Sequence, residues 1–259
     1  MVDQNLRKLP PGWRWESPFA SLMSWLDPEV RLAPERAALP AEFSDSTWIL
    51  HSQFYRPSDA KSEPFGEPKF GNFKPRPPED WRRVRWHEHA KKKGETLQAG
   101  IFDGTEVPPC FRWNGILLWN QGPMYDPKLN GTDDETYSVS EDTLDEYDLT
   151  ALLEIALEHT EAKRAWGTFS FADIHTYMGA DSNSQYGPQM GFSFELEQLL
   201  PDMLTPAENY CTPEFWWPED RSWLVWTDRD LNGTKVFGSA AMIAKIRASE
   251  VLETIDWHP

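Results

Sequence analysis

The segment SWLVWTDRDLNGTKVFGSAAMIAKIRASEVLETIDW, residues 222–257, carries the most regular pattern in the chain. Its expected elements are a strand from Ser222 to Leu231, a hairpin turn at Asn232-Gly233, a strand from Thr234 to Phe237, an N-cap at Gly238-Ser239, a helix from Ala240 to Leu252 and a strand from Thr254 to Trp257. β-Branched and aromatic residues favour strands, and Asn-Gly is a preferred hairpin turn because both residues tolerate positive φ. The segment therefore predicts a C-terminal unit of β-hairpin, helix and strand.

The rest of the chain adds helices and strands to this unit. Asp148 to Trp166 predicts a helix, because its leucines recur at helical spacing and Gly167 follows as a stop. A second helix is expected from Pro78 to the lysines at 91–93, and strands are expected from Thr47 to Tyr55 and from Phe111 to Asn120. We expect an α+β fold in which helices pack on a mixed or antiparallel sheet.

Prolines mark the less regular parts of the chain. Residues 1–45 contain repeated prolines that interrupt regular structure, and we interpret them as a partly extended N-terminal arm. Residues 58–78, SDAKSEPFGEPKFGNFKPRPP, contain no run long enough for an element, which makes this segment the candidate internal boundary. The length suits a single large α+β domain, 1–259, with two closely packed halves as the alternative.

Composition argues against several classes of protein. The 14 Trp, 14 Phe and 7 Tyr supply enough large apolar side chains for a packed core, which argues against wholesale disorder. No run approaches the roughly 18–20 apolar residues of a membrane helix, and the N-terminus lacks an apolar signal core. We therefore expect a cytoplasmic protein without a membrane partner. Cys110 and Cys211 stand in neither a CxxC nor a Cys/His spacing, so neither a disulfide framework nor a zinc site is predicted.

The negative charge is concentrated in one part of the chain. The formal net charge is −17, yet residues 1–100 hold 16 Lys and Arg against 14 Asp and Glu, whereas residues 101–259 hold 9 against 28. A surface with this excess of carboxylates repels nucleic acid and attracts a basic protein partner. Solubility alone is the alternative explanation of the excess.

The densest acidic tract lies between Asp126 and Asp148, where Lys128 is the single base. We predict that it forms an exposed anionic face that binds a cationic protein partner. The predicted partner-binding residues are Asp133, Asp134, Glu135, Tyr137, Glu141, Asp142, Asp145, Glu146 and Asp148. The structural alternative is a solvated loop followed by a helix start, where acidic side chains interact favourably with the helix dipole.

A basic segment from Arg82 to Lys93 precedes this tract. Its arginines and lysines, interleaved with tryptophans, resemble a nucleic-acid-binding stripe, and contact with the acidic half of the same chain explains them equally well. His87-Glu88-His89 could suggest a metal site. On a helix, however, residues two apart point about 200° away from each other, so the two rings would not share an ion.

Sequence motifs for catalysis are few. The chain has no GxSxG, HExxH, GxxxxGK[ST] or GxGxxG motif. An alternative hypothesis, a hydrolase or metal-dependent enzyme, would use Asp228, Asp230 and His175, the last of which lies close to Ser170 and Asp173. Two carboxylates at alternate positions of a strand project from one face and could hold a divalent ion, but acids also commonly cap turns next to Asn-Gly. We therefore assign no catalytic residue, metal or cofactor.

The segment Trp217-Pro218-Glu219-Asp220-Arg221-Ser222-Trp223, followed by Thr227-Asp228 and Gly238-Ser239, resembles the ending of bacterial immunity-type proteins of polymorphic-toxin systems. The likeness covers about 40 of the 259 residues and transfers no site residues to this chain. It implies a cytosolic protein that neutralises a cognate toxin by occupying its active site. An acidic surface would suit a toxin with a basic substrate cleft, such as a nuclease. The sequence does not predict the oligomeric state.

Overall fold

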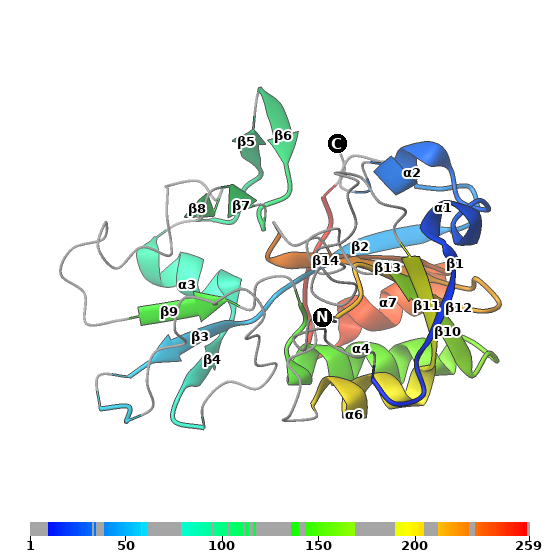
Figure 1. Ribbon diagram of the computed structural model, residues 1–259. Coiled ribbons are helices and arrows are strands. Elements are labelled where there is room, and N and C mark those ends of the chain that lie inside the picture. Colours follow the sequence, from blue (N-terminus) through cyan, green and yellow to red (C-terminus); the bar gives the residue numbers. More distant parts are fainter. Residues whose placement is uncertain are drawn as a thin grey trace, which may run out of the picture.

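The computed structural model shows an α+β fold built around one large antiparallel sheet (Figure 1). It describes residues 10–32, 34, 39–57, 59–61, 79–94, 96–102, 104–110, 112–113, 116–117, 136–139, 143–168, 190–204, 212–227 and 231–257. The expected α+β class is confirmed. In these ranges no helix combines the length and the apolar character needed to cross a membrane.

Eight strands form the main sheet in the spatial order β1, β11, β10, β12, β13, β14, β2, β15, and neighbouring strands are antiparallel. Their bounds are β1 Arg14–Pro18, β2 Asp45–Leu50, β10 Arg164–Thr168, β11 Met190–Glu195, β12 Phe215–Pro218, β13 Leu224–Thr227, β14 Gly233–Gly238 and β15 Glu253–Ile255. Strands β12, β13 and β14 are buried along their whole length. Both faces of the central sheet are therefore covered.

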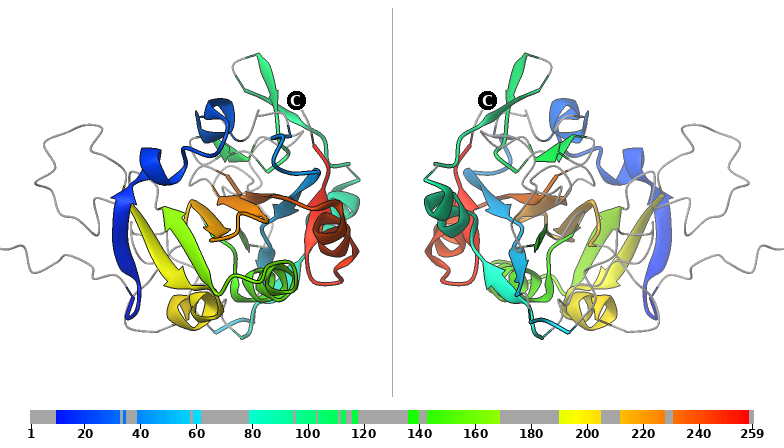
Figure 2. Two further views of the ribbon diagram at one scale, coloured as in Figure 1. Left: turned by 90° about the vertical axis from the view of Figure 1, so that its right-hand side faces the viewer. Right: turned by 90° about the vertical axis from the view of Figure 1, so that its left-hand side faces the viewer.

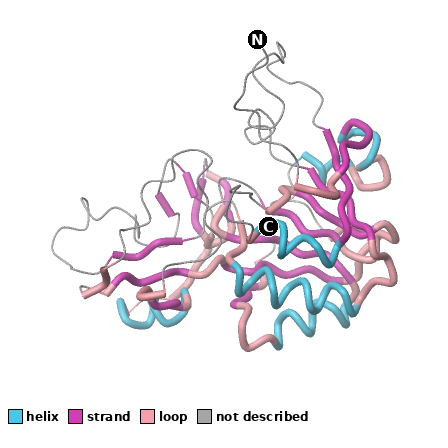
Figure 3. The backbone as a smooth tube through the Cα atoms, turned by 60° about the horizontal axis from the view of Figure 1, so that its bottom comes forward, coloured by secondary structure: helices cyan, strands magenta, loops and turns pink. Residues whose placement is uncertain are grey.

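Alternate side chains of these strands enter two hydrophobic clusters, one on each face of the sheet. Trp216 and Val225 belong to the first cluster, whereas Phe215 and Trp226 belong to the second. The first face packs against α4 (Glu146–Glu158), α6 (Leu199–Met203) with its preceding 3-10 turn η1 (Leu196–Gln198), and α7 (Ala240–Ala248). The second face is covered in part by the segment that contains α1 (Phe19–Leu22) and α2 (Pro28–Leu32). Figures 2 and 3 show the α4, α6 and α7 layer on its side of the sheet.

Helix α4 begins at Glu146 because Asp145 caps it, and its leucines face the first cluster. The expected helix from Asp148 to Trp166 is therefore correct in its first part and wrong in its second. After Glu158 the chain leaves the helix, and Arg164–Thr168 becomes β10. Hydrogen bonds to β11 on one side and β12 on the other override the local helical pattern there.

Smaller sheets lie beside the main sheet, on the left of Figure 1. A three-stranded antiparallel sheet has the order β4 (Arg82–Val84), β3 (Gln53–Arg56), β9 (Thr136–Val139). Two hairpins pair β5 (Gly100–Phe102) with β6 (Thr105–Val107) and β7 (Arg112–Trp113) with β8 (Ile116–Leu117). The strand expected over Phe111–Asn120 is thus two short strands that pair with each other.

Two further expectations need correction because pairing with β3 was not foreseen. The strand expected from Thr47 to Tyr55 is divided at His51 and Ser52, since β2 joins the main sheet and β3 joins the three-stranded sheet. The helix expected from Pro78 starts only at Trp86, because β4 precedes it and pairs with β3. This helix, α3 (Trp86–Lys93), ends at Gly94, whose φ of 73° suits glycine.

In the C-terminal region β13 pairs with β14, and α7 and β15 follow. Gly233 does not lie in the expected turn. It is the first residue of β14 and pairs with Leu50 of β2. A Cβ at this position would collide with Sγ of Cys110, so glycine is required by close packing rather than by a turn.

Candidate functional site

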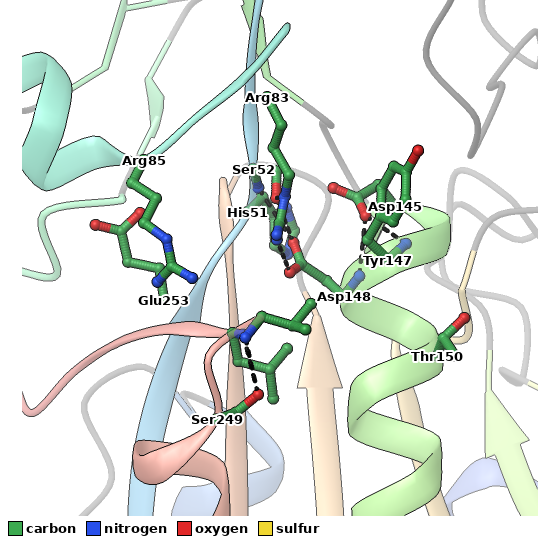
Figure 4. Close-up of polar contacts among 12 residues, drawn as sticks. His51, Ser52, Arg83, Arg85, Asp145, Tyr147, Asp148, Thr150, Ser249 and Glu253 are labelled. Carbon is green, nitrogen blue, oxygen red and sulfur yellow. Dashed lines mark hydrogen bonds and ion pairs between the residues drawn. The ribbon is translucent and has the colours of Figure 1, made fainter. Parts of the chain in front are cut away.

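A cluster of buried polar side chains surrounds the junction between β2 and β3 (Figure 4). Ser52 lies between the two sheets, Arg83 comes from β4, and Asp145 and Asp148 come from the start of α4. Both aspartates and Ser52 are buried, and the Arg83 side chain is 26% exposed. The cluster thus joins the three-stranded sheet to the helical layer of the main sheet.

Asp148 accepts hydrogen bonds through both carboxyl oxygens. Arg83 Nη2 donates to Oδ1, and Ser52 donates to Oδ2 through its hydroxyl at 2.8 Å and its backbone N–H at 3.3 Å. Arg83 Nε also donates to Ser52 Oγ at 2.6 Å. These contacts form a closed ring of donors and acceptors among the three side chains.

Asp145 is the N-cap of α4. Its Oδ1 accepts from the backbone N–H groups of Tyr147 at 2.7 Å and Asp148 at 2.9 Å. Its Oδ2 is buried and finds no hydrogen-bond partner in the part of the chain that the structure describes. The Tyr147 ring is about half exposed and lies under the Arg83 guanidinium, 5.8 Å from centroid to Cζ.

Burial changes the acid–base behaviour of this cluster. Loss of solvent raises the pKa of Asp148 to about 8, and the neighbouring Asp145 carboxylate raises it further, whereas Arg83 and the Ser52 hydroxyl oppose the increase. Shifted pKa values are common at functional sites, but structural ion-pair networks also produce them. The contacts of this cluster hold elements of the fold together.

A second set of contacts extends from the same junction. His51 Nε2 lies 2.8 Å from Thr234 Oγ1, which lies 2.7 Å from Thr227 Oγ1, and all three side chains are buried. Trp86 Nε1 donates to the His51 carbonyl at 2.6 Å. Glu253 accepts from the backbone N–H groups of Trp86 at 2.7 Å and His87 at 2.9 Å, and from Nδ1 of His87. The Glu253 carboxylate therefore holds the N-terminus of α3 against β15.

The histidines near α3 have separate partners. His87 contacts Glu253, whereas His89 Nδ1 lies 2.7 Å from Gln53 Oε1 in the interior. In the described ranges no three His, Cys, Asp or Glu side chains gather as metal ligands. Cys110 is fully buried, and this burial raises the pKa of its thiol to about 12.

In the part of the chain that the structure describes, the predicted partner-binding residues do not form a single exposed surface. Asp145 and Asp148 are completely buried, which corrects their expected place on an exposed face. Their carboxylates cap α4 and pair with Arg83 instead. Glu146 is half-buried in the first turn of α4, and Tyr137 lies in β9. The other predicted residues lie outside the described residues: Asp133, Asp134, Glu135, Glu141 and Asp142, and likewise Asp228, Asp230 and His175 of the enzyme hypothesis.

Sequence analysis did not single out His51 or Ser52, because they lie inside a run that looks like one continuous strand. Contact with the acidic half of the chain is one of the two explanations of the basic segment, and Arg83 makes such a contact with Asp148. Arg85 also donates to a backbone carbonyl of the acidic half, that of Glu250. A pairing of residues 65 positions apart has no local sequence pattern that could identify it.

Comparison of the chain with protein-family models, curated protein sequences and solved structures finds no match.

Proposed function

We propose that this protein binds a cationic protein partner and acts as an immunity protein that neutralises a toxin by occupying the toxin's basic active-site cleft. The supporting observation is an excess of carboxylates in the helical layer of the main sheet. Residues 143–168 and 190–204, which include α4, η1 and α6, contain nine Asp and Glu against two Lys and Arg, whereas α7 of the same layer adds Lys245 and Arg247 and no acid. The exposed members, which we call the acidic helical face, are Glu154, Glu158, Glu161, Glu195 and Glu197.

These side chains come from segments that lie next to each other. Helix α4 contacts both η1 and α6, and Arg164 of β10 pairs with Glu195 of β11. Lys245 of α7 forms an ion pair with Glu158 and lowers the pKa of that carboxyl, so part of the charge is neutralised within the protein. The remaining carboxylates have the sign and exposure needed to attract a basic surface.

The resemblance of the last 40 or so residues, from Trp217 onward, to immunity-type proteins is the reason for proposing an immunity protein in particular. An inhibitor that mimics a polyanionic substrate would accelerate association through long-range attraction. Such attraction weakens as salt rises, because the Debye length falls from about 30 Å at 0.01 M to about 8 Å at 0.15 M. The complex should therefore form rapidly at low ionic strength and much more slowly at high ionic strength.

The direct experiment uses the protein encoded by the neighbouring reading frame as the probe. Association with the full chain is measured by stopped-flow fluorescence at low and high salt, and the toxin's activity is assayed with and without the chain. The test variant is Glu154→Lys with Glu197→Lys, because neither side chain has a structural role among the described contacts. Reversal at Asp145 is avoided, since loss of the α4 N-cap would mix folding with binding.

The matched control is Glu42→Lys with Glu250→Lys, two exposed acids outside the helical layer that give the same change in net charge. We expect the test variant to slow association at least about tenfold at low salt and the control to slow it much less. Equal rates for the two variants, or a toxin whose activity is unaffected by the chain, would contradict the proposal.

One observation supports the enzyme hypothesis as a second candidate. The backbone carbonyl of Glu214 accepts the N–H of Thr227, and the N–H of Glu214 donates to the carbonyl of Thr168. Strands β10 and β13, which flank β12, therefore have their C-terminal ends close together. The segments that carry His175 and the pair Asp228 and Asp230 begin at these two ends. The test is hydrolysis of ester and phosphodiester probes by the full chain. Activity that survives both His175→Ala and Asp228→Asn with Asp230→Asn would remove this hypothesis.

A further inference from the structure

The carboxyl groups of Asp145 and Asp148 are buried together at the first turn of α4. Asp145 Oδ1 accepts the backbone N–H of Asp148 at 2.9 Å, so the two carboxyl groups are close neighbours. A direct hydrogen bond between them requires a proton on one of them, because two ionised carboxylates carry no hydrogen. Asp145 Oδ2 is also without a donor among the described residues, although a buried carboxylate oxygen normally has one.

We propose that Asp145 and Asp148 share a single proton, and that this proton makes the attachment of β4 to α4 sensitive to pH. The proton resides on Asp148 and is donated to Asp145 Oδ2. This assignment follows from the N-cap geometry: the Asp145 carboxyl accepts two backbone N–H groups at the positive end of the helix dipole, whereas Asp148 accepts no backbone donor of the helix.

The acceptor sites of Asp148 agree with this assignment. A carboxyl group offers about four positions for hydrogen bonds. Three are occupied by donors: Arg83 Nη2, Ser52 N–H and Ser52 O–H. A proton on Oδ1, directed at Asp145, fills the fourth and leaves the Arg83 contact intact. The same proton satisfies Asp145 Oδ2, which otherwise remains without a donor.

The charges around the pair also favour one proton. Arg83 of β4 is the cation that contacts it, against two carboxylates. In the described part of the chain no other Lys or Arg contacts the pair. The neighbouring side chains are Ser52 and His51 at the β2–β3 junction, the latter hydrogen-bonded to Thr234, and Glu146 and Tyr147 of α4. Two anions and one cation in a buried site are stabilised when one anion is neutralised.

The effect on stability follows from proton linkage. The pKa of Asp148 in the folded protein, about 8, exceeds its ordinary value of 3.8. Between these values the folded state binds more protons than the unfolded state, so folding stability decreases as pH rises through this range. Above it, Asp148 is ionised while buried beside Asp145. Separation of β4 from α4 would return this charge to water, so the contact weakens although Arg83 compensates for part of the charge.

The test variant is Asp145→Asn. Asparagine caps a helix about as well as aspartate, and its amide would place N–H donors where Oδ2 now lies. Asp148 should then ionise at a lower pH than in the natural sequence, because the Asp145 charge is gone, although burial still opposes ionisation. The measurement is the pH titration of aspartate carboxyl carbons by NMR on the full chain labelled with ¹³C-aspartate. In the natural sequence we expect one carboxyl to titrate near pH 8. In Asp145→Asn this titration should move to lower pH, and the pH range over which the urea midpoint falls should move with it.

The matched control is Asp220→Asn, the same change at an aspartate whose pKa is lowered by hydrogen bonds from Thr160 and Ser222 despite opposing desolvation. It should leave the alkaline titration unchanged. A natural-sequence spectrum in which no aspartate titrates above about pH 6 overturns the proposal whether or not Asp145→Asn folds. An alkaline titration that Asp145→Asn leaves at the same pH overturns it equally.

Discussion

The Arg83 guanidinium of β4 donates to the carboxyl of Asp148 in the first turn of α4, with exposed fractions of 26% and 0% for the two side chains. Ser52, at the junction of β2 and β3, contacts both of them. Three segments that are separate in the sequence are therefore held at one point. Removal of one partner from such a pair leaves the other buried without compensation, which is more damaging than replacement of both.

Substitution Arg83→Met should destabilise the protein in a pH-dependent way. We expect a loss of about 3 kcal/mol in the free energy of unfolding above about pH 9, where Asp148 is ionised, and a clearly smaller loss near pH 6. Urea unfolding followed by tryptophan fluorescence measures both values. Arg82→Met, at an exposed position of the same strand, is the control with the same change in charge. A loss that does not depend on pH would contradict the expectation.

Substitution Glu253→Ala should loosen the N-terminus of α3. Its carboxylate accepts two backbone N–H groups, from Trp86 and His87, and both would lose their acceptor. We expect a loss of about 2 kcal/mol and faster hydrogen exchange at these two amides. Glu250→Ala is the control, because the Glu250 side chain is exposed and only its backbone carbonyl contacts Arg85. Unchanged exchange at Trp86 and His87 would show that Glu253 is not their cap.

Substitution Leu152→Ala should leave a cavity in the cluster between α4 and the main sheet. Leu152 is fully buried there, and truncation of a buried leucine costs about 2–5 kcal/mol. Glu154→Ala, two residues further along the same helix and exposed, should change stability by no more than about 0.5 kcal/mol. Thermal and urea unfolding measure both. Similar losses in the free energy of unfolding for the two variants would show that Leu152 is not part of a tightly packed core.

Two glycine substitutions distinguish tight packing from adaptable packing. A Cβ at Gly233 would meet Sγ of Cys110 and the backbone oxygen of Ile49, whereas a Cβ at Gly191 would meet the flexible end of Leu22. We expect Gly233→Ala to lower the free energy of unfolding by about 1–3 kcal/mol and Gly191→Ala by less. Cys110→Ala in the Gly233→Ala background should recover part of the loss, measured as a coupling energy in a double-mutant cycle.

Local sequence patterns predicted the fold class and, to within a few residues, the start of helix α4. The leucines of α4 are periodic, and the acidic residues at its start were correctly assigned to a helix N-terminus as one alternative. Local patterns did not predict the end of that helix, because Arg164–Thr168 is a strand only when β11 and β12 lie on either side. Pairing with distant strands decides such segments.

The buried polar cluster of Ser52, Arg83, Asp145 and Asp148 could not be predicted from local patterns either, because it also depends on contacts between distant segments. Ser52 looks like a strand residue, Arg83 like part of a basic surface, and Asp148 like an exposed acid. Their roles depend on contacts 65 and 96 positions apart along the chain. Counting acidic residues identified the charged half of the protein but could not separate the buried aspartates from the glutamates that reach solvent.

The position of β2 has a consequence for synthesis. This strand lies between β14 and β15, so both of its neighbours are supplied by residues 233–255. A nascent chain emerges from the ribosome with Trp48 and Ile49 long before those residues are translated. Until residues 233–255 have been translated, the hydrophobic strand β2 lacks both of its pairing partners and can bind chaperones or aggregate. C-terminal truncations should therefore yield insoluble chains rather than smaller folded ones.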